Sequence, residues 1–440
     1  MPPSLHTFLS TDLPALLAAT FAAVSCALLG NFLVLRRQSL MGDAISHAVL
    51  PGLVAAFLIA GTRSAWPMFV GAALAGVVTV VLVELVRRLG RVEPGAAMGV
   101  VFSIMFALGV VLLERAAARH VDLDADCVLY GQLELIFWFP PNTWSDLLTL
   151  DTLSQFPRQP TTLAVVTLLT IALVTLLFKE LRLAAFDPDL ATSLGFSATA
   201  LHFILMLFVA GAVVASFEAV GSILVVAMLI CPAATARLLT DRLLPQVLVS
   251  VLAALISALG GYALAATAPT WLGTPKALSA AGMITTVSGV LLTAAIFFSP
   301  THGVLAKRLR HVRLAITIAR EDLLATLYRL EEANQPPPAA AQSSVLSPQS
   351  FALRLALRNH EIEQTPSGAL RLTETGRDAA RRLIRTHRLW ETYLVEAANL
   401  RPDHVHDTAE TLEHLTTPPI HAELTRHPPP PTDPQGKPIP

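Results

Sequence analysis

Residues Leu13 to Leu35 read LPALLAATFAAVSCALLGNFLVL, an apolar stretch of 23 residues without a charged side chain. A helix needs about 20 apolar residues to cross the hydrocarbon core of a bilayer. This stretch is therefore predicted to span a membrane. Arg36 and Arg37 follow it directly and no basic segment precedes it, which is typical of a retained span rather than of a cleaved signal sequence.

The charge content of the chain changes at about residue 300. Residues 1–300 hold 30 charged side chains, whereas the much shorter stretch 301–440 holds 33. Only the second stretch approaches the roughly one quarter of charged residues that soluble proteins carry. The sequence therefore predicts a transmembrane domain over 1–300 and a soluble domain over 301–440. It excludes a secreted domain, a cytosolic enzyme and a disordered chain.

Nine apolar runs are long enough to cross a bilayer as helices, which predicts an all-α polytopic membrane domain of about nine spans. Only Glu218 separates the sixth and seventh runs, so a tight hairpin or a broken helix is expected there. The distribution of Lys and Arg between the loops places the amino terminus outside and the tail in the cytoplasm. The runs are 13–35, 44–60, 67–86, 95–113, 161–178, 200–217, 219–236, 246–265 and 278–298.

Residues 36–52, RRQSLMGDAISHAVLPG, place two ionisable side chains beside apolar sequence. Asp43 and His47 are four residues apart, so they project from one face of a helix. A carboxylate oxygen and an imidazole nitrogen are suitable ligands for a divalent first-row metal, and both groups are costly in hydrocarbon unless they face a cavity. We expect these residues to line a metal path; the alternative is an Asp–His hydrogen bond at a helix end.

His202 and Glu218 are secondary candidates for the path, with a packed histidine and a solvated turn as the alternatives. Pro232 is expected to break its span near the membrane face. A run of small residues with Arg237 follows, and a short helix with an alanine face would allow another protein to pack closely. The alternative is a helix kink followed by an ordinary loop. The small residues are Ala233, Ala234 and Ala236.

Two motifs, Arg36–Gly52 and Glu218–Leu239, resemble the permease subunits of ABC importers for manganese, zinc and iron, and the likeness extends over roughly residues 10–300. It implies a fold similar to type-II importers, working as a homo- or heterodimer in the bacterial cytoplasmic membrane. It also implies that Asp43 and His47 bind metal in the translocation path, and that the stretch Pro232–Arg242 docks on a separate ATPase. An extracytoplasmic metal-binding protein would deliver the substrate.

The sequence contains no G-x-x-x-x-G-K-[ST] motif, the loop that cradles nucleotide phosphates. The chain is therefore not expected to be an enzyme itself or to bind ATP, and hydrolysis must come from a partner subunit.

The soluble tail has the outline of a winged helix. An amphipathic helix is predicted over 313–333, a Pro/Ala-rich linker over about 334–346 and a second helix over 348–359. A hairpin of 361–364 and 370–372 follows, because Pro366 and Gly368 are turn residues. The last helices are predicted over 374–398 and 403–415.

Histidines and carboxylates gather in these last helices. His387 and Glu391 are four residues apart, and the positions of four further residues place them on one face of the next helix. Nitrogen and oxygen ligands of this kind suit zinc, manganese or iron; a solvated polar face is the alternative. The four residues are His406, Glu410, Glu413 and His414.

Four motifs over roughly 318–440 resemble the metal-dependent repressors of the DtxR/MntR-like family: LTETGR at 372–377, THRLWE at 386–391, VHDTAETLEH at 405–414 and GKPIP at 436–440. The resemblance implies one metal site of His387, Glu391 and His406, and a second of Glu410, Glu413 and His414. Asp322 falls at a ligand position of the family's first helix. That family reads DNA with two helices where this chain has a linker and one helix, which argues against DNA recognition.

The sequence thus predicts the permease subunit of an ATP-driven importer of divalent manganese, zinc or iron, with a fused cytoplasmic metal-sensing domain. A membrane-anchored, metal-dependent transcription regulator is the alternative, although a tether needs far fewer spans. A self-sufficient secondary carrier is disfavoured because so few ionisable residues lie within the spans.

Overall fold

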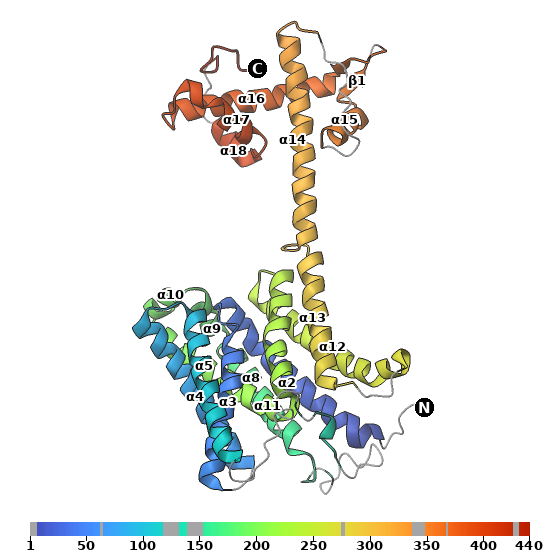
Figure 1. Ribbon diagram of the computed structural model, residues 1–440. Helices are drawn as coiled ribbons and strands as arrows, with labels where there is room; N and C mark the ends of the chain where they lie inside the picture. Colours follow the sequence, from blue (N-terminus) through green and yellow to red (C-terminus); the bar gives the residue numbers. More distant parts are fainter. Residues whose placement is uncertain are drawn as a thin grey trace. The chain divides into compact units, whose positions relative to one another are not determined.

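The computed structural model describes residues 7–61, 65–117, 131, 133–138, 152, 154–273, 278–336, 348–366, 368–425 and 431–440. The chain divides into two compact units, which we call the amino-terminal unit (Met1–Ala306) and the carboxy-terminal unit (Lys307–Pro440). Helices dominate both units (Figure 1).

The amino-terminal unit is a bundle of long apolar helices. Within the described residues, eight helices are long and apolar enough to cross a membrane, and large apolar side chains such as Leu74, Ile104 and Leu168 are exposed on them. Lipid accepts such a surface, whereas water does not. The elements are η1 (Phe8–Asp12), α2 (Leu13–Leu35), α3 (Met41–Ala60), α4 (Ala65–Gly90), α5 (Pro94–Ala117), η2 (Leu133–Leu135), α8 (Arg158–Leu176), α9 (Phe178–Phe186), α10 (Pro188–Ser193), α11 (Ala198–Leu239), α12 (Leu243–Leu272) and α13 (Ala280–Phe298). The expected all-α polytopic domain is confirmed.

The sixth and seventh predicted runs form a single element, α11, which explains eight helices instead of nine. A straight helix would separate His202 from Leu229 by about 40 Å. Both residues nevertheless contact the end of α2: His202 lies 2.9 Å from the Arg36 guanidinium, and Leu229 packs against Gly30. The chain turns back at Gly221, whose backbone is non-helical with φ 76° and ψ 167°. The two arms of α11 therefore form a hairpin.

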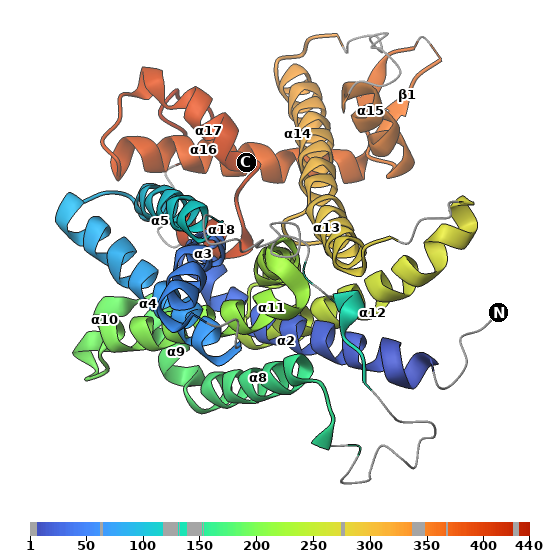
Figure 2. The ribbon, with the colours of Figure 1, turned by 60° about the horizontal axis from the view of Figure 1, so that its bottom comes forward.

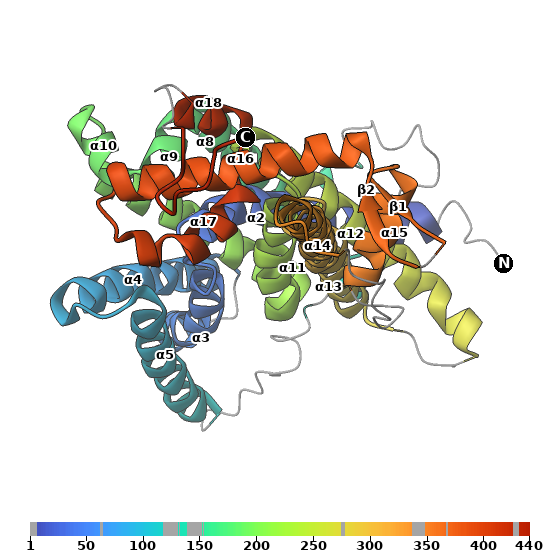
Figure 3. The ribbon, with the colours of Figure 1, turned by 90° about the horizontal axis from the view of Figure 1, so that it is seen from above.

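Helix α2 lies at the centre of this unit and packs against α8, both arms of α11, and α12 (Figure 2). A side chain at Gly30 would collide with the backbone of Leu229, so the absence of one permits the close approach of α2 and α11. Helices α3, α4 and α5 form a neighbouring group (Figure 3). There, Gly52 of α3 and Gly71 of α4 allow the two backbones to meet.

The carboxy-terminal unit contains the predicted winged-helix elements. Strands β1 and β2 pair antiparallel, with Ile362 opposite Leu372. Leu324 and Leu327 pack with Ile362, Leu370 and Ala380 to form its core. The helices α16, α17 and α18 lie together beyond that core (Figure 3). The elements are α14 (Val304–Glu332), α15 (Pro348–Arg358), β1 (Ile362–Gln364), β2 (Leu370–Leu372), α16 (Glu374–Glu396), η4 (Pro402–His404), α17 (His406–Glu413) and α18 (Pro418–Leu424).

Some sequence-based expectations were wrong or incomplete. Pro232 does not break its span, because α11 continues to Leu239; the break lies at Gly221. The short helices α9, α10 and α18 were not predicted. Most of the predicted linker, residues 337–346, lies outside the described residues.

Candidate metal centres

The Asp43–His47 pair lies in the first two turns of α3. Asp43 Oδ1 and His47 Nε2 are 3.3 Å apart, and their side chains are 41% and 30% exposed. The His47 ring meets Phe102 and Phe106 of α5 edge-on, with centroids 4.8 and 5.8 Å away. His47 is thus packed against two aromatic rings, while both side chains of the pair stay partly open to binding.

The two secondary path candidates lie in different surroundings. His202 is 12% exposed and sits between Arg36 and Glu84, whose Oε2 is 3.9 Å from His202 Nε2. Both ring nitrogens of His202 therefore face charged partners. Glu218 is exposed near the turn of α11, three residues before Gly221. Among the described residues, neither His202 nor Glu218 forms a group of possible metal ligands with Asp43 and His47.

The predicted docking stretch, Pro232–Arg242, is largely buried over residues 232–236 and exposed towards its end. Ala233 and Ala236 are 0% exposed, and Ala233 lies against Gly30 of α2. These alanines, like the buried Pro232, cannot offer their side chains to another protein in this conformation. Ala234 is half-buried, and the partly exposed Arg237 pairs with Asp241 at 3.6 Å.

The first ligand group of the carboxy-terminal unit joins α16 to α17. The side chains of His387 and Glu391 share one face of α16, with Nε2 and Oε1 3.1 Å apart. His406 Nδ1 lies 3.1 Å from His387 Nε2 and 2.8 Å from Glu391 Oε1. Thus two imidazole nitrogens and a carboxylate oxygen converge on one point. This donor set fits zinc, manganese or iron.

The second ligand group joins α14 to the end of α17. His414 Nε2 lies 3.1 Å from Asp322 Oδ1 and 3.6 Å from Glu413 Oε1. The other nitrogen, Nδ1, lies 2.7 Å from Glu321 Oε2. A carboxylate in this position orients a ligating imidazole, and sequence reasoning had given Glu321 no role.

The structure brings together six of the seven residues predicted as ligands in this unit, with one regrouping. Asp322 joins Glu413 and His414 directly, whereas Glu410 is not among the atoms that converge. Burial raises the pKa of Asp322; His414 opposes this shift, and the nearby charge of Glu410 adds to it. The two ligand groups are adjacent, because Glu413 Oε2 lies 2.6 Å from His387 Nδ1, in a contact poorly aligned for a hydrogen bond.

Charges around these groups shift their proton affinities. Burial lowers the pKa of His387, but contacts with Glu391 and Glu413 outweigh burial and raise this pKa to about 9. Burial raises the pKa of Glu391, and the two histidines more than reverse the effect. The Glu321 hydrogen bond raises the pKa of His414. Metal must therefore displace protons when it binds here.

The carboxy-terminal residues of the chain contact α16 beside the first ligand group. Arg388 is buried and contacts the Pro438 carbonyl and the Asp433 carboxylate. Gln435 Nε2 donates to Glu391 Oε1 at 3.4 Å. Sequence reasoning had noted the closing GKPIP motif but not these contacts, which connect distant parts of the chain.

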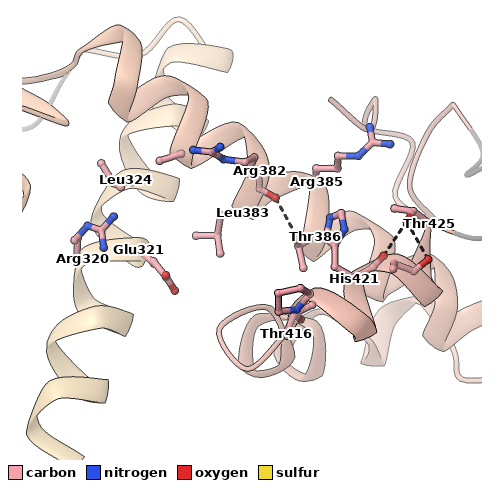
Figure 4. Close-up of a pocket in the computed structure, with 13 residues that line it drawn as sticks. Arg320, Glu321, Leu324, Arg382, Leu383, Arg385, Thr386, Thr416, His421 and Thr425 are labelled. Atoms are coloured by element: carbon pink, nitrogen blue, oxygen red, sulfur yellow. Dashed lines mark hydrogen bonds between the residues drawn. The ribbon is translucent and has the colours of Figure 1, made fainter. Parts of the chain in front are cut away.

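A cavity of about 740 Å³ opens beside the second group, between α14, α16 and α18. Figure 4 shows Glu321, Leu383 and His421 lining it from the three helices. Glu321 thus touches both the cavity and His414.

In the comparison with known proteins, each of the two units matches a protein family. Residues 9–137 and 151–299 match the ABC 3 transport family, and residues 373–440 match the metal-binding and dimerisation domain of iron-dependent repressors. These matches confirm the two resemblances noted in the sequence.

Individual relatives agree with the first match. The chain is 41% identical to the manganese transport system membrane protein MntD of Bacillus subtilis, over 66% of this chain and 93% of that protein. It is 40% identical to the zinc transport system membrane protein TroD of Treponema pallidum, over 66% and 75%. The solved structure of PsaBC from Streptococcus pneumoniae in complex with Fab is 26% identical, with a TM-score of 0.52 over 67% of this chain and 94% of that one. With its transmembrane helices and the match over most of the amino-terminal unit, the chain belongs to the ABC 3 transport family.

Proposed function

We propose that this protein is the permease subunit of an ATP-driven importer of a divalent transition metal ion, manganese, zinc or iron. The proposal rests on the Asp43–His47 pair, held partly open on α3 of a chain that belongs to a transport family. In the same proposal, the carboxy-terminal unit lies in the cytoplasm and adjusts transport to the metal concentration there.

The metal path runs along the surface of α3 that carries Asp43 and His47. Both side chains remain partly exposed in the single chain, and two ligands leave a coordination shell incomplete. A second permease subunit, identical or different, would enclose this surface and supply further ligands. An extracytoplasmic metal-binding protein would release the ion into the path.

ATP hydrolysis belongs to a separate subunit, since the chain lacks a phosphate-binding loop. Of the predicted docking stretch, Ala234 and the segment from Arg237 to Arg242 remain accessible. The helices α9 and α10 offer a second surface, because Phe186, Leu190 and Leu194 are 57%, 46% and 60% exposed outside the membrane helices. Exposed apolar side chains in such a place favour a protein partner. The ATPase would contact one or both segments.

Two substitutions separate these docking surfaces. Ala234→Trp places a bulky ring beside Arg237, and Leu190→Asp puts a charge on α10. The variant that uncouples ATP hydrolysis from uptake in reconstituted vesicles identifies the segment used. Normal coupling in both variants would contradict docking at either segment.

The arginines support a cytoplasmic location for one end of the bundle. Arg36, Arg87 and Arg88 lie together around one cavity at the ends of α2 and α4, as the positive-inside tendency expects of the cytoplasmic side.

The test of the path is uptake of radioactive manganese by vesicles that contain the chain and its partner subunits. The double variant Asp43→Ala/His47→Ala should reduce uptake to background, because the transient ligands are lost, while the complex still assembles. Glu93→Gln, an exposed carboxylate between α4 and α5, is the matched control and should transport normally. Normal uptake by the double variant would overturn the assigned path.

A further inference from the structure

A cavity of about 360 Å³ lies in the amino-terminal unit, where α2 and α4 end and α11 begins, near α9 and α10. We call it the basic pocket; its polar lining is Arg36, Arg37, Gln38, Glu84, Arg87, Arg88, Thr199 and His202. None of these residues belongs to the two ligand groups of the carboxy-terminal unit or to the Asp43–His47 pair; His202 is the secondary path candidate that the structure leaves apart from that pair.

Positive charge in the basic pocket exceeds negative charge. Glu84 neutralises part of it, with Oε1 2.8 Å from Arg87 and 2.5 Å from Arg88. Arg36 has an imidazole partner instead of a carboxylate, since its Nη1 meets His202 Nδ1 at 2.9 Å. Arg37 forms no ion pair among the described residues and is exposed. Four guanidinium groups therefore face one carboxylate.

Two buried polar atoms in the basic pocket also have no hydrogen-bond partner. They are Arg36 Nε and Gln38 Oε1, and Gln38 is only 6% exposed. Burying such groups unpaired costs free energy. A ligand that brings an oxyanion to Arg36 and a hydroxyl to Gln38 would satisfy both atoms.

The location of the basic pocket indicates the source of that ligand. Arg36 directly follows α2, and Arg87 and Arg88 lie in the last turn of α4. The ends of membrane helices lie at the depth of lipid headgroups, where basic pockets between helices bind anionic lipids.

We propose that the basic pocket binds the phosphate group of an anionic phospholipid, with a headgroup hydroxyl at Gln38. Phosphatidylglycerol has both groups. Free phosphate shares the oxyanion but lacks the acyl chains that hold a lipid beside the helices. This inference goes beyond the proposed function and requires only that the bundle lies in a membrane.

The test is thermal unfolding of the full chain in detergent, with added phosphatidylglycerol, phosphatidylcholine or inorganic phosphate. Phosphatidylglycerol should raise the melting temperature in a concentration-dependent way, and phosphatidylcholine should not. Equal protection by inorganic phosphate at the same concentration would assign the pocket to a soluble anion and overturn the lipid source. Absence of protection by every additive would overturn the site.

Variants connect the effect to this pocket. Arg37→Gln removes an exposed charge and should weaken apparent lipid affinity about fivefold, the contribution of one basic residue near an anionic surface. Arg36→Lys keeps the charge but loses the Nε donor, and should weaken binding as well. Arg182→Gln removes an exposed arginine of α9 that does not line the pocket, and should bind like the parent. Equal affinities of Arg37→Gln and the parent would contradict the assignment.

Discussion

At the scale of single residues, the two ligand groups of the carboxy-terminal unit differ in how they are supported. In the first group, His387 and Glu391 are nearly inaccessible, with side chains 4% and 2% exposed. In the second, His414 depends on Glu321 from a different helix for the orientation of its ring. The second group should therefore respond to changes outside its own ligands.

Glu321→Gln should lower the affinity of the second group for manganese by about 10–100-fold, as loss of an orienting partner of a metal ligand does. The ligands themselves remain, so binding should weaken rather than disappear. Calorimetry on the full chain measures the effect. Glu331→Gln is the control, because Glu331 pairs only with the exposed Arg377 in the described part of the chain. Unchanged affinity in Glu321→Gln would show that His414 is oriented by other means.

Metal binding to the first group should strengthen as pH rises towards 9. In the metal-free protein, the raised pKa of His387, about 9, keeps a proton on a ring that must be neutral to bind metal. Each displaced proton makes apparent affinity rise by about tenfold per pH unit below that pKa. The same raised pKa stabilises the metal-free fold below the unfolded value of about 6.5, and this contribution is lost as pH rises through 9. Titrations at pH 6.5, 7.5 and 8.5 measure the slope; a flat profile would contradict the proton competition.

The sequence predicted contacts between residues close together in the chain, but not contacts between helices that are far apart in the chain. His387 and Glu391 were predictable because four-residue spacing on a helix fixes their proximity. The contact of Asp322 with His414 depends on the packing of α14 against α17, which spacing cannot supply; only the family resemblance pointed to Asp322. Glu321 left no signal, because a carboxylate on a polar helix face is ordinary.

At the scale of elements, α11 shows that the apolar pattern predicts helical runs more reliably than the breaks between them. Hydropathy identified both arms, since each is a long apolar run. The sequence predicted a hairpin or broken helix at Glu218, three residues before the observed turn at Gly221, but it also predicted a break at Pro232 that does not occur. A proline in a membrane helix is tolerated when neighbouring helices satisfy the freed backbone groups, and the second arm packs closely on α2 around that point.

Gly221→Ala should destabilise the amino-terminal unit by about 1–3 kcal/mol. The backbone at Gly221, with φ 76° and ψ 167°, lies in a region that residues with a side chain rarely enter. Thermal unfolding of the purified protein measures the loss. Gly211→Ala in the first arm of α11 is the matched control, because its added methyl group would meet no atom within 4 Å. A melting temperature equal to that of the control would show that the turn tolerates a side chain.

At the scale of the whole molecule, a unit of a transport family and a unit similar to metal-dependent repressors are joined in one chain. The last residues before α14 are fastened to the end of α11: Ser299 and Thr301 donate to the Leu238 carbonyl, and His302 lies 3.0 Å from Asp241. Asp241 also pairs with Arg237 of the predicted docking stretch. A signal arriving along α14 would therefore reach the stretch that is expected to face the ATPase.

A chain that ends at Ala306 should import metal but lose its response to cytoplasmic metal. The Ser299, Thr301 and His302 contacts are all retained in such a chain, so the amino-terminal unit should remain intact, while both ligand groups of the sensor are removed. If the carboxy-terminal unit slows import when metal is plentiful, vesicles preloaded with manganese should slow uptake by the full chain and leave the shortened chain unaffected. His387→Ala/His414→Ala in the full chain should behave like the shortened chain, because it removes one ligand from each group and leaves the domain attached. Equal slowing of all three proteins by internal manganese would show that the carboxy-terminal unit does not control transport.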